Sequence, residues 1–204
     1  MELVPSLALA GGLAWASGMR LYAVVFIAGM LSRFDLLQLP DSLHILEHPW
    51  VLWTAGLLLT VEFFADKVPA VDSLWDSVHT FIRIPAGALL AALAMGGHDP
   101  ALMVVAGLLG GTLTAGTHAF KAGSRALVNT SPEPFSNVAV SLGEDVLVAS
   151  GLLTAIYNPI VFLVMLGIFV GLLIWLLPKL WRGVRMAFGR LFKTQTTPAS
   201  AAEP

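Results

Sequence analysis

An uninterrupted apolar run at residues 160–177 most constrains how this chain folds, because none of its side chains is charged. A helix of that length rises about 27 Å, close to the roughly 30 Å hydrocarbon core of a bilayer. In the whole chain, 57% of residues are hydrophobic and 12% are charged, whereas soluble domains have about 25% charged residues. The sequence therefore predicts an all-α polytopic membrane protein.

Further apolar stretches, separated by polar or proline-containing turns, predict about six transmembrane helices. The first, residues 3–34, is interrupted by Ser17, Gly18 and Arg20. This pattern predicts either one broken spanning helix or a re-entrant piece followed by a span. Irregular backbone is tolerated at membrane depth only where it faces protein or water. Arg20 then either snorkels from a helix end or faces a cavity.

The chain also divides near Asp99 into two halves of three predicted spans, which must run in opposite directions. Each half contains one polar, proline-broken segment, the pattern of an inverted-repeat transporter. We therefore predict a single transmembrane domain at residues 1–193 with repeats at 1–98 and 99–178. A basic amphipathic helix is expected at 179–193, and a disordered tail at 194–204.

Two charge-rich segments stand out from this apolar background. They are residues 62–83, EFFADKVPAVDSLWDSVHTFIR, and residues 118–145, HAFKAGSRALVNTSPEPFSNVAVSLGED. Charges near membrane depth are costly unless they are used, so both segments are candidates for the functional site. Between Pro69 and Pro85, apolar residues recur at helical spacing, which predicts a short amphipathic helix at the interface or in a cavity.

Paired carboxylates in the first segment suggest a cation or proton site. Glu62 and Asp66 lie four residues apart, as do Asp72 and Asp76, so each pair shares a helical face. Such pairs ligate a hard cation such as Mg²⁺ or share one proton. His79 would complete a metal site with Asp72 and Asp76, or a proton relay. Alternatively, nearby basic residues simply neutralise these acids.

In the second segment, His118, Lys121 and Arg125 follow one helical face. They would bind phosphate or carboxylate, pair with the carboxylates of the first segment, or serve as a plain positive-inside anchor. Glu144 and Asp145 are adjacent, so on a helix at least one should point inward unless the helix breaks at Gly143. The predicted ion or proton path comprises Glu62, Asp66, Asp72, Asp76, His79, Glu144 and Asp145, and the predicted counter-charges or anion contacts are Arg20, Lys67, Arg83, His118, Lys121 and Arg125.

Basic residues also predict orientation. With six spans and a cytoplasmic C-terminus, nine of the eleven Lys and Arg residues fall on the cytoplasmic side, which places both termini there. These nine are Lys67, Arg83, Lys121, Arg125, Lys179, Arg182, Arg185, Arg190 and Lys193.

Four stretches resemble a bacterial membrane protein family known as domain of unknown function 4126. They are ASGMRLY at residues 16–22, VEFFADKVPAVDSLWDSVHTFIRIPAGALLA at 61–91, KAGSRALVNTSPEPFSNVAVSLGEDVLV at 121–148, and WLLPKLWR at 175–182. The resemblance covers nearly the whole chain except the tail. It implies a polytopic protein of the bacterial inner membrane, and it brings no activity with it.

Three functions fit these patterns. The leading hypothesis is a small transporter or channel for a cation or a proton-coupled small solute. One alternative is a metal-dependent membrane enzyme or flippase acting on a phosphorylated lipid, with carboxylates holding Mg²⁺ and basic residues holding phosphate. The other is a non-catalytic membrane scaffold. The net charge of −2 argues against nucleic acid as a partner, and faces of small residues favour homo-oligomers.

Overall fold

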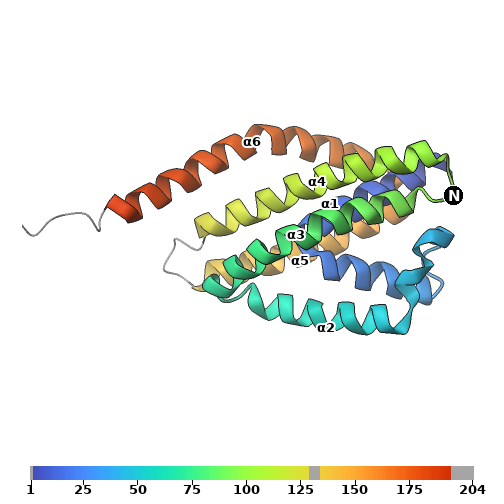
Figure 1. Ribbon diagram of the computed structural model, residues 1–204, viewed down its shortest axis with the longest axis horizontal. Helices are drawn as coiled ribbons and strands as arrows, with labels where there is room; N and C mark the ends of the chain where they lie inside the picture. Colours follow the sequence, from blue (N-terminus) through green and yellow to red (C-terminus); the bar gives the residue numbers. More distant parts are fainter. Residues whose placement is uncertain (1, 129–133, 194–204) are drawn as a thin grey trace, which may run out of the picture.

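A computed structural model describes residues 2–128 and 134–193, and every regular element in them is helical (Figure 1). The elements are α1 (Leu3–Arg33), a 3₁₀ helix η1 (Asp41–Glu47), α2 (Pro49–Ala65), α3 (Pro69–Ala94), α4 (Pro100–Val128), α5 (Pro134–Tyr157) and α6 (Pro159–Lys193). Five helices are long and apolar enough to cross a membrane, and α2 is a shorter apolar helix. The chain is an all-α polytopic membrane protein, as predicted. The predicted disordered tail lies outside the described residues.

Helix α1 turns back on itself at Arg20, whose φ of −145° and ψ of 72° are not helical. Before the bend, α1 packs along α5, with Gly12 beside Ala155. After the bend it packs along α2 in the reverse direction, so that Gly29 lies beside Leu52. Both ends of α1 therefore lie at the same end of the bundle (Figure 1). Arg20, at the bend, is fully buried. The first apolar stretch is thus broken and re-entrant rather than one straight span.

The first and last described residues lie at opposite ends of the bundle (Figure 1). This differs from the six-span prediction, which places both termini on one side, because α1 returns to the end from which it starts. Only α2 to α6 run from end to end. Within the predicted repeats, α2 and α5 run in opposite directions, as do α3 and α6 (Figure 1). The bent α1 has no bent counterpart in α4, and the inverted repeat stays a prediction.

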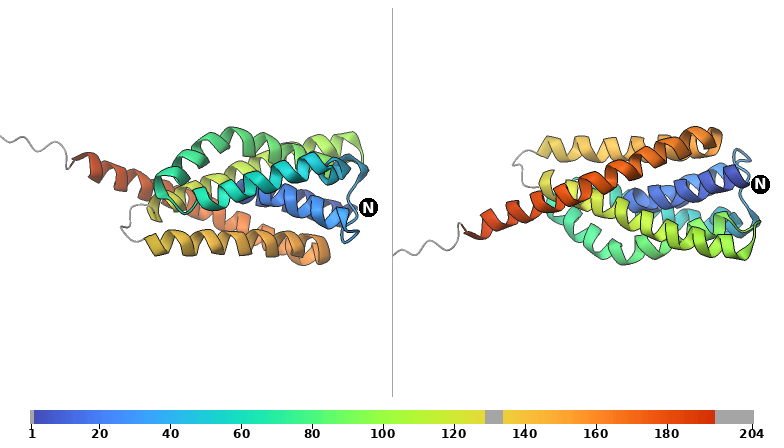
Figure 2. Two further views of the ribbon diagram at one scale, coloured as in Figure 1. Left: turned by 90° about the horizontal axis from the view of Figure 1, so that it is seen from below. Right: turned by 90° about the horizontal axis from the view of Figure 1, so that it is seen from above.

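Two prolines lie inside helices instead of ending them. Pro85 lies within α3 and Pro178 within α6. A proline in a helix interior removes one hydrogen bond and favours bending, and α3 is visibly bowed (Figure 2). The amphipathic helix predicted between Pro69 and Pro85 is therefore part of α3, with its polar face turned into the bundle. The basic helix predicted at residues 179–193 is the continuation of α6.

The centre of the bundle is α1. In its most apolar stretch 72% of residues are buried, against 11% in α6, which packs at the periphery. Large apolar side chains cover the outer surface, while the buried residues include many charged ones. This distribution is the reverse of that in a soluble protein, and it fits a bundle surrounded by lipid.

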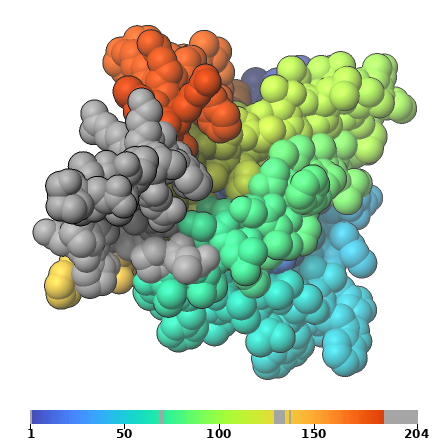
Figure 3. All heavy atoms as spheres, turned by 60° about the vertical axis from the view of Figure 1, so that its left-hand side comes forward, coloured from blue at the N-terminus to red at the C-terminus, as the bar shows by residue number. Residues whose placement is uncertain are grey.

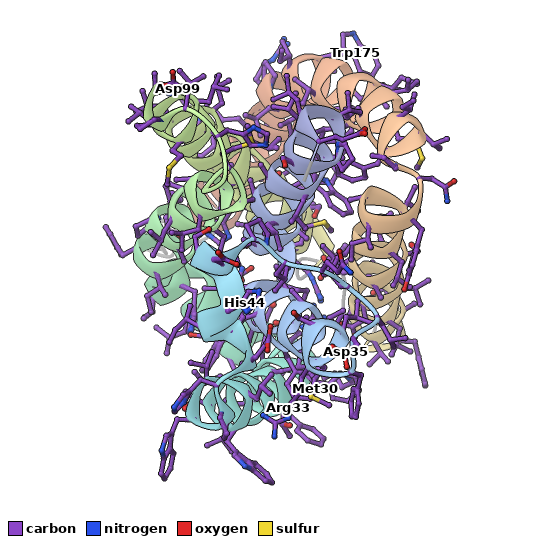
Figure 4. All side chains as sticks on the ribbon, turned by 90° about the vertical axis from the view of Figure 1, so that its right-hand side faces the viewer. Met30, Arg33, Asp35, His44, Asp99 and Trp175 are labelled. Carbon is purple, nitrogen blue, oxygen red and sulfur yellow. The ribbon has the colours of Figure 1, made fainter. Side chains whose placement is uncertain are left out.

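At the end of the bundle where the chain begins, charged side chains lie on short connections. Figure 4 shows Met30, Arg33 and Asp35 together where α1 ends, with His44 on η1 beside them. Asp99 precedes α4 at the same end and accepts a hydrogen bond from the Ala101 backbone N–H (2.7 Å). These charged residues are exposed, so the buried charges of the molecule lie elsewhere.

Candidate functional site

Five helices contribute side chains to one charged cluster in the other half of the bundle. Nine of its ten members are at most 6% exposed, and the side chain of the tenth, Asp145, is 28% exposed. The cluster consists of Arg20 from α1, Glu62 and Asp66 from α2, Asp72, Asp76 and Arg83 from α3, Lys121 and Arg125 from α4, and Glu144 and Asp145 from α5.

Arg20, at the bend of α1, ties α2 to α5. One of its terminal nitrogens lies 2.5 Å from the Asp66 carboxylate, and its Nε lies 3.0 Å from Asp145. The other terminal nitrogen donates a hydrogen bond to the hydroxyl of Ser141 (2.9 Å). Because Arg20 is fully buried, it does not snorkel to the interface. It is the central cation of the cluster.

The second and third cations connect α2, α3 and α4. Arg83 pairs with Glu62 and donates a hydrogen bond to Asp76 (2.8 Å). The Nζ of Lys121 lies 3.4 Å from Asp66 and 3.5 Å from Asp76. Lys121 also donates to the carbonyl of Met19 (3.2 Å), just before the bend of α1. A helix bend leaves backbone carbonyls without their helical partners, and here a cluster cation binds one of them.

Arg125 holds α5 against the other helices. It donates to both oxygens of Glu144, at 3.1 and 2.8 Å, and to the backbone carbonyl of Asp66. Glu144 and Asp145 thus both reach the cluster, because cations from two different helices meet them. The helix break considered at Gly143 is absent, since α5 is continuous from Pro134 to Tyr157.

Two histidines flank the cluster and form hydrogen bonds with side chains of neighbouring helices. Arg83 donates to Nδ1 of His118 (3.2 Å), so this nitrogen carries no proton. Nε2 of His118 then donates to the hydroxyl of Thr80 (2.7 Å). Nδ1 of His79 donates to the Trp75 carbonyl, which leaves its Nε2 to accept from the hydroxyl of Tyr22 (2.9 Å). His118 is therefore neutral in this network.

The predicted metal site of Asp72, Asp76 and His79 is not assembled. No group of three or more acidic or histidine side chains in residues 2–128 and 134–193 is arranged to hold a metal ion. The imidazole nitrogens of His79 bond to Trp75 and Tyr22, and Asp76 bonds to Arg83. These three side chains therefore do not fit the predicted Mg²⁺ site.

Lys67, predicted as a counter-charge, lies at the edge of the cluster. Its Nζ donates to the Phe63 carbonyl and lies 3.0 Å from the centre of the Phe63 ring. Burial lowers the pKa of Lys67, and the nearby Asp145 carboxylate offsets part of that effect. Lys67 therefore lies near the carboxylates but forms no ion pair with another described residue.

Acids outnumber bases in this cluster. Six carboxylates face the four cations Arg20, Arg83, Lys121 and Arg125. Counting Lys67 at the edge as a fifth cation still leaves one carboxylate in excess. Moreover, Oε2 of Glu62 and Oδ2 of Asp76 are buried and accept no hydrogen bond from the described residues. A buried network of this kind favours uptake of a cation or a proton.

A small polar pocket opens onto the cluster between α3 and α4. Its volume is about 210 Å³. The lining residues are Asp72, Ser73, Asp76, Ser77, Thr80, Ala122, Arg125 and Ala126. Carboxylate oxygens, three hydroxyls and one guanidinium thus surround the space. Of the carboxyl pairs predicted from spacing, Asp72 and Asp76 share this pocket. Glu62 and Asp66 are not among its lining residues, and they share the cation Lys121, whose Nζ lies 3.9 and 3.4 Å from them.

The sequence matches the family described as "Domain of unknown function (DUF4126)" over residues 7–179. The chain belongs to this family. No curated protein and no solved structure matches it. The family description carries no activity, so the function of this DUF4126 protein has to be argued from the charged cluster and its pocket.

Close helix contact brings α1 into place in this DUF4126 protein. A Cβ atom at Gly18 would lie 2.6 Å from the Thr114 carbonyl oxygen and 2.7 Å from the Cβ of Thr117. Only glycine allows α1 to approach α4 this closely just before the bend. The Thr114 hydroxyl also donates to the Ala14 carbonyl (2.8 Å). Small residues on α1 therefore place Arg20 within reach of the acids.

Neutral polar residues around the cluster were not predicted. Ser141 binds Arg20, Thr80 binds His118, and Tyr22 binds His79. Two of them do carry a sequence signal, since Thr80 lies four residues after Asp76 and Ser141 lies three before Glu144. Each therefore shares a helical face with a cluster acid. Tyr22 lies two residues after Arg20, and only the bend of α1 explains why its hydroxyl reaches His79.

Proposed function

We propose that this protein is a small transporter or channel that moves a cation or a proton-coupled small solute across the membrane. The observation that carries the proposal is the buried cluster, in which acids outnumber bases beside an accessible polar pocket. Asp76 is the key residue, because it belongs to both the network and the pocket lining.

The excess of carboxylates in the cluster favours binding of a positive charge that can also leave, either a cation or a proton. Removing one partner from a buried ion pair costs roughly 3–5 kcal/mol, because an uncompensated charge remains. A carboxylate in excess is stabilised either by a bound cation or by a proton shared with a neighbour. Binding and release of that charge then change the interactions of Arg83 and Lys121, which contact the same carboxylates.

The pocket dimensions favour a small substrate. Sites for larger organic ligands occupy roughly 300–1,000 Å³, whereas this pocket has about 210 Å³ and carries carboxylates, hydroxyls and a guanidinium among its lining residues. An ion with several waters fits such a space, as does a small polar solute. The size and lining therefore favour ion or solute movement over the processing of a lipid headgroup.

Orientation follows from the basic residues near one end of the bundle. Lys67, Lys179, Arg182 and Arg185 belong to the α2–α3 turn and the last part of α6, and these segments lie at the same end (Figure 1). By the positive-inside rule, this end faces the cytoplasm and the start of the chain faces the opposite side. The polar pocket is then an entrance on the cytoplasmic half of a bacterial inner-membrane protein.

Flux measurements in proteoliposomes test the proposal. Imposed gradients of H⁺, Na⁺, K⁺ and Mg²⁺ are compared for the unaltered protein, Asp76→Asn and Glu144→Gln. We expect flux of at least one ion in the unaltered protein and a loss of tenfold or more in Asp76→Asn. Gel filtration and thermal unfolding of each variant separate a loss of transport from a loss of folding.

Asp99→Asn is the matched control, because Asp99 is an acid at the other end and asparagine also caps helices well. Its flux should equal that of the unaltered protein. Absence of flux for every ion, or unchanged flux in both cluster variants, would contradict the proposal. Phospholipid scrambling would then be the next activity to assay.

A further inference from the structure

A second, apolar groove adjoins the polar pocket along α4 and lies between α4 and the last part of α6. Its volume is about 500 Å³. Small residues form the α4 wall, and larger apolar residues form the α6 wall. Figure 3 shows the end of α4, in yellow-green, next to α6, in orange. The lining residues are Ala119, Ala122, Gly123, Ala126, Leu177, Pro178, Leu180, Trp181 and Val184.

Basic residues lie beside this groove on α6. Arg185 is four residues beyond Trp181, so both share the helix face that lines the groove. Arg182 is next to that face, and its Nε donates to the Pro178 carbonyl (3.3 Å). Both arginines are exposed, and neither forms an ion pair within residues 2–128 and 134–193. Helix α6 itself contains no acidic residue.

Lys179 provides a contrast on the same helix. It lies two residues before Trp181, on the other face of α6, and its Nζ lies 3.1 Å from the centre of the Trp175 ring. Trp175 points outward from the bundle (Figure 4). Positive charge is therefore present on both faces of α6, but only the face with Arg185 adjoins an apolar groove.

We propose that this groove binds one anionic phospholipid, with an acyl chain between α4 and α6 and the phosphate at Arg182 and Arg185. A phospholipid combines an apolar chain and a negative headgroup, which match the apolar groove and the unpaired basic rim. The exposed Trp181 is typical of residues at the membrane interface. This proposal does not depend on transport activity, although Ala122 and Ala126 also line the polar pocket.

Native mass spectrometry of the protein in detergent micelles tests this site. The probes are phosphatidylglycerol, phosphatidylcholine and glycerol 3-phosphate, each titrated separately. We expect one phosphatidylglycerol to be retained per chain, at least tenfold more tightly than phosphatidylcholine. Glycerol 3-phosphate should not bind, because the groove holds the chain as well as the phosphate.

Variants distinguish specific lipid binding in the groove from general attraction between anionic lipid and a basic helix. Arg182→Gln with Arg185→Gln should weaken phosphatidylglycerol retention about 25-fold, at roughly fivefold for each charge removed. Ala119→Leu fills the groove and should abolish retention without changing charge. Lys179→Gln, on the other face of the same helix, should retain the lipid like the unaltered protein.

Two results would overturn the proposal. Equal weakening by Lys179→Gln and by loss of the two arginines would indicate only the general attraction of a basic helix. A lipid-free dimer that Ala119→Leu dissociates would instead assign the groove to a second copy of the chain.

Discussion

The two ends of this molecule use charged residues in different ways. At the end where the chain begins, the acidic Glu47 accepts hydrogen bonds from residues close to it in sequence, from Ser32 to its carboxylate (2.6 Å) and from Arg33 to its carbonyl (3.1 Å). In the charged cluster, Arg20 has partners far away in sequence, and it meets Asp145 through the fold alone. The difference indicates that solvent and short loops are enough to stabilise the exposed charges, whereas the buried cluster forms only when the whole bundle is folded.

Side-specific labelling tests whether both ends of α1 lie at the same end of the bundle. Each position should be labelled from one side of the membrane and not from the other. The chain has no cysteine, so single cysteines report directly. Leu3→Cys and Phe34→Cys lie near the two ends of α1 and are exposed. A membrane-impermeant maleimide applied to sealed vesicles should label both from one side, and should label Val68→Cys only from the other. Labelling of Leu3→Cys and Phe34→Cys from opposite sides would mean that α1 spans the membrane.

Among the stability measurements, the largest difference is expected between two variants that each replace one arginine of α1, Arg20 or Arg33. Arg20→Met leaves Asp145 without its ion-pair partner and removes the shortest ion pair of Asp66, which should lower the free energy of unfolding by roughly 3–5 kcal/mol. Arg33→Met removes an exposed side chain and should cost under about 1 kcal/mol. Denaturant titration in mixed micelles measures both. Similar losses for the two variants would remove the contrast between the ends.

Glycine-to-alanine substitutions near the cluster and at the other end of the bundle should also differ in their effect on stability, by a smaller amount than the arginine substitutions. Gly18→Ala puts a methyl group 2.6 Å from the Thr114 carbonyl oxygen, and we expect a loss of about 1–3 kcal/mol from overpacking. Gly97→Ala, at the opposite end, meets nothing within 4 Å and should change stability far less. Thermal unfolding of both variants gives the comparison. Equal midpoints would argue against close contact between α1 and α4.

The smallest expected effect is a gain in stability. Gly143 lies within α5 beside Glu144, and a Cβ there meets no atom within 4 Å. Gly143→Ala should therefore stabilise the protein by about 0.5–1 kcal/mol, because alanine favours a helix interior. The same thermal unfolding measurement applies. A loss of stability would indicate that α5 is not a regular helix at this position.

Much of the helical architecture is predictable from the sequence, because long apolar runs have few alternatives to spanning helices. Charged residues in such a chain are also easy to single out, and those of the charged cluster do lie together. Their partners are less predictable. Spacing places Asp72 and Asp76 on one helical face, but Tyr22 and Trp75 determine where His79 bonds. Similarly, the prolines at 85 and 178 do not end their helices, because packing against neighbouring helices maintains them.

The direction of α1 after Arg20 was open for a related reason. Ser17, Gly18 and Arg20 indicate an interruption, but local sequence cannot say whether the chain continues or turns back. The direction is determined by packing, because α1 contacts α5 before the bend and α2 after it. Helix α5 comes much later in the chain, and the position of α2 itself depends on the bend. The consequence is a different relation between the two termini.

The most direct test of the central claim is reversible blocking of the polar pocket. Ser77 is exposed and lines the pocket, so Ser77→Cys in this cysteine-free chain offers one reactive thiol. Flux in proteoliposomes is measured before treatment with a charged thiol reagent, after it, and again after reduction. We predict that modification from the side of the α6 C-terminal end abolishes flux and that reduction restores it. Full modification with unchanged flux would contradict the proposal that the pocket and its charged cluster form the transport path.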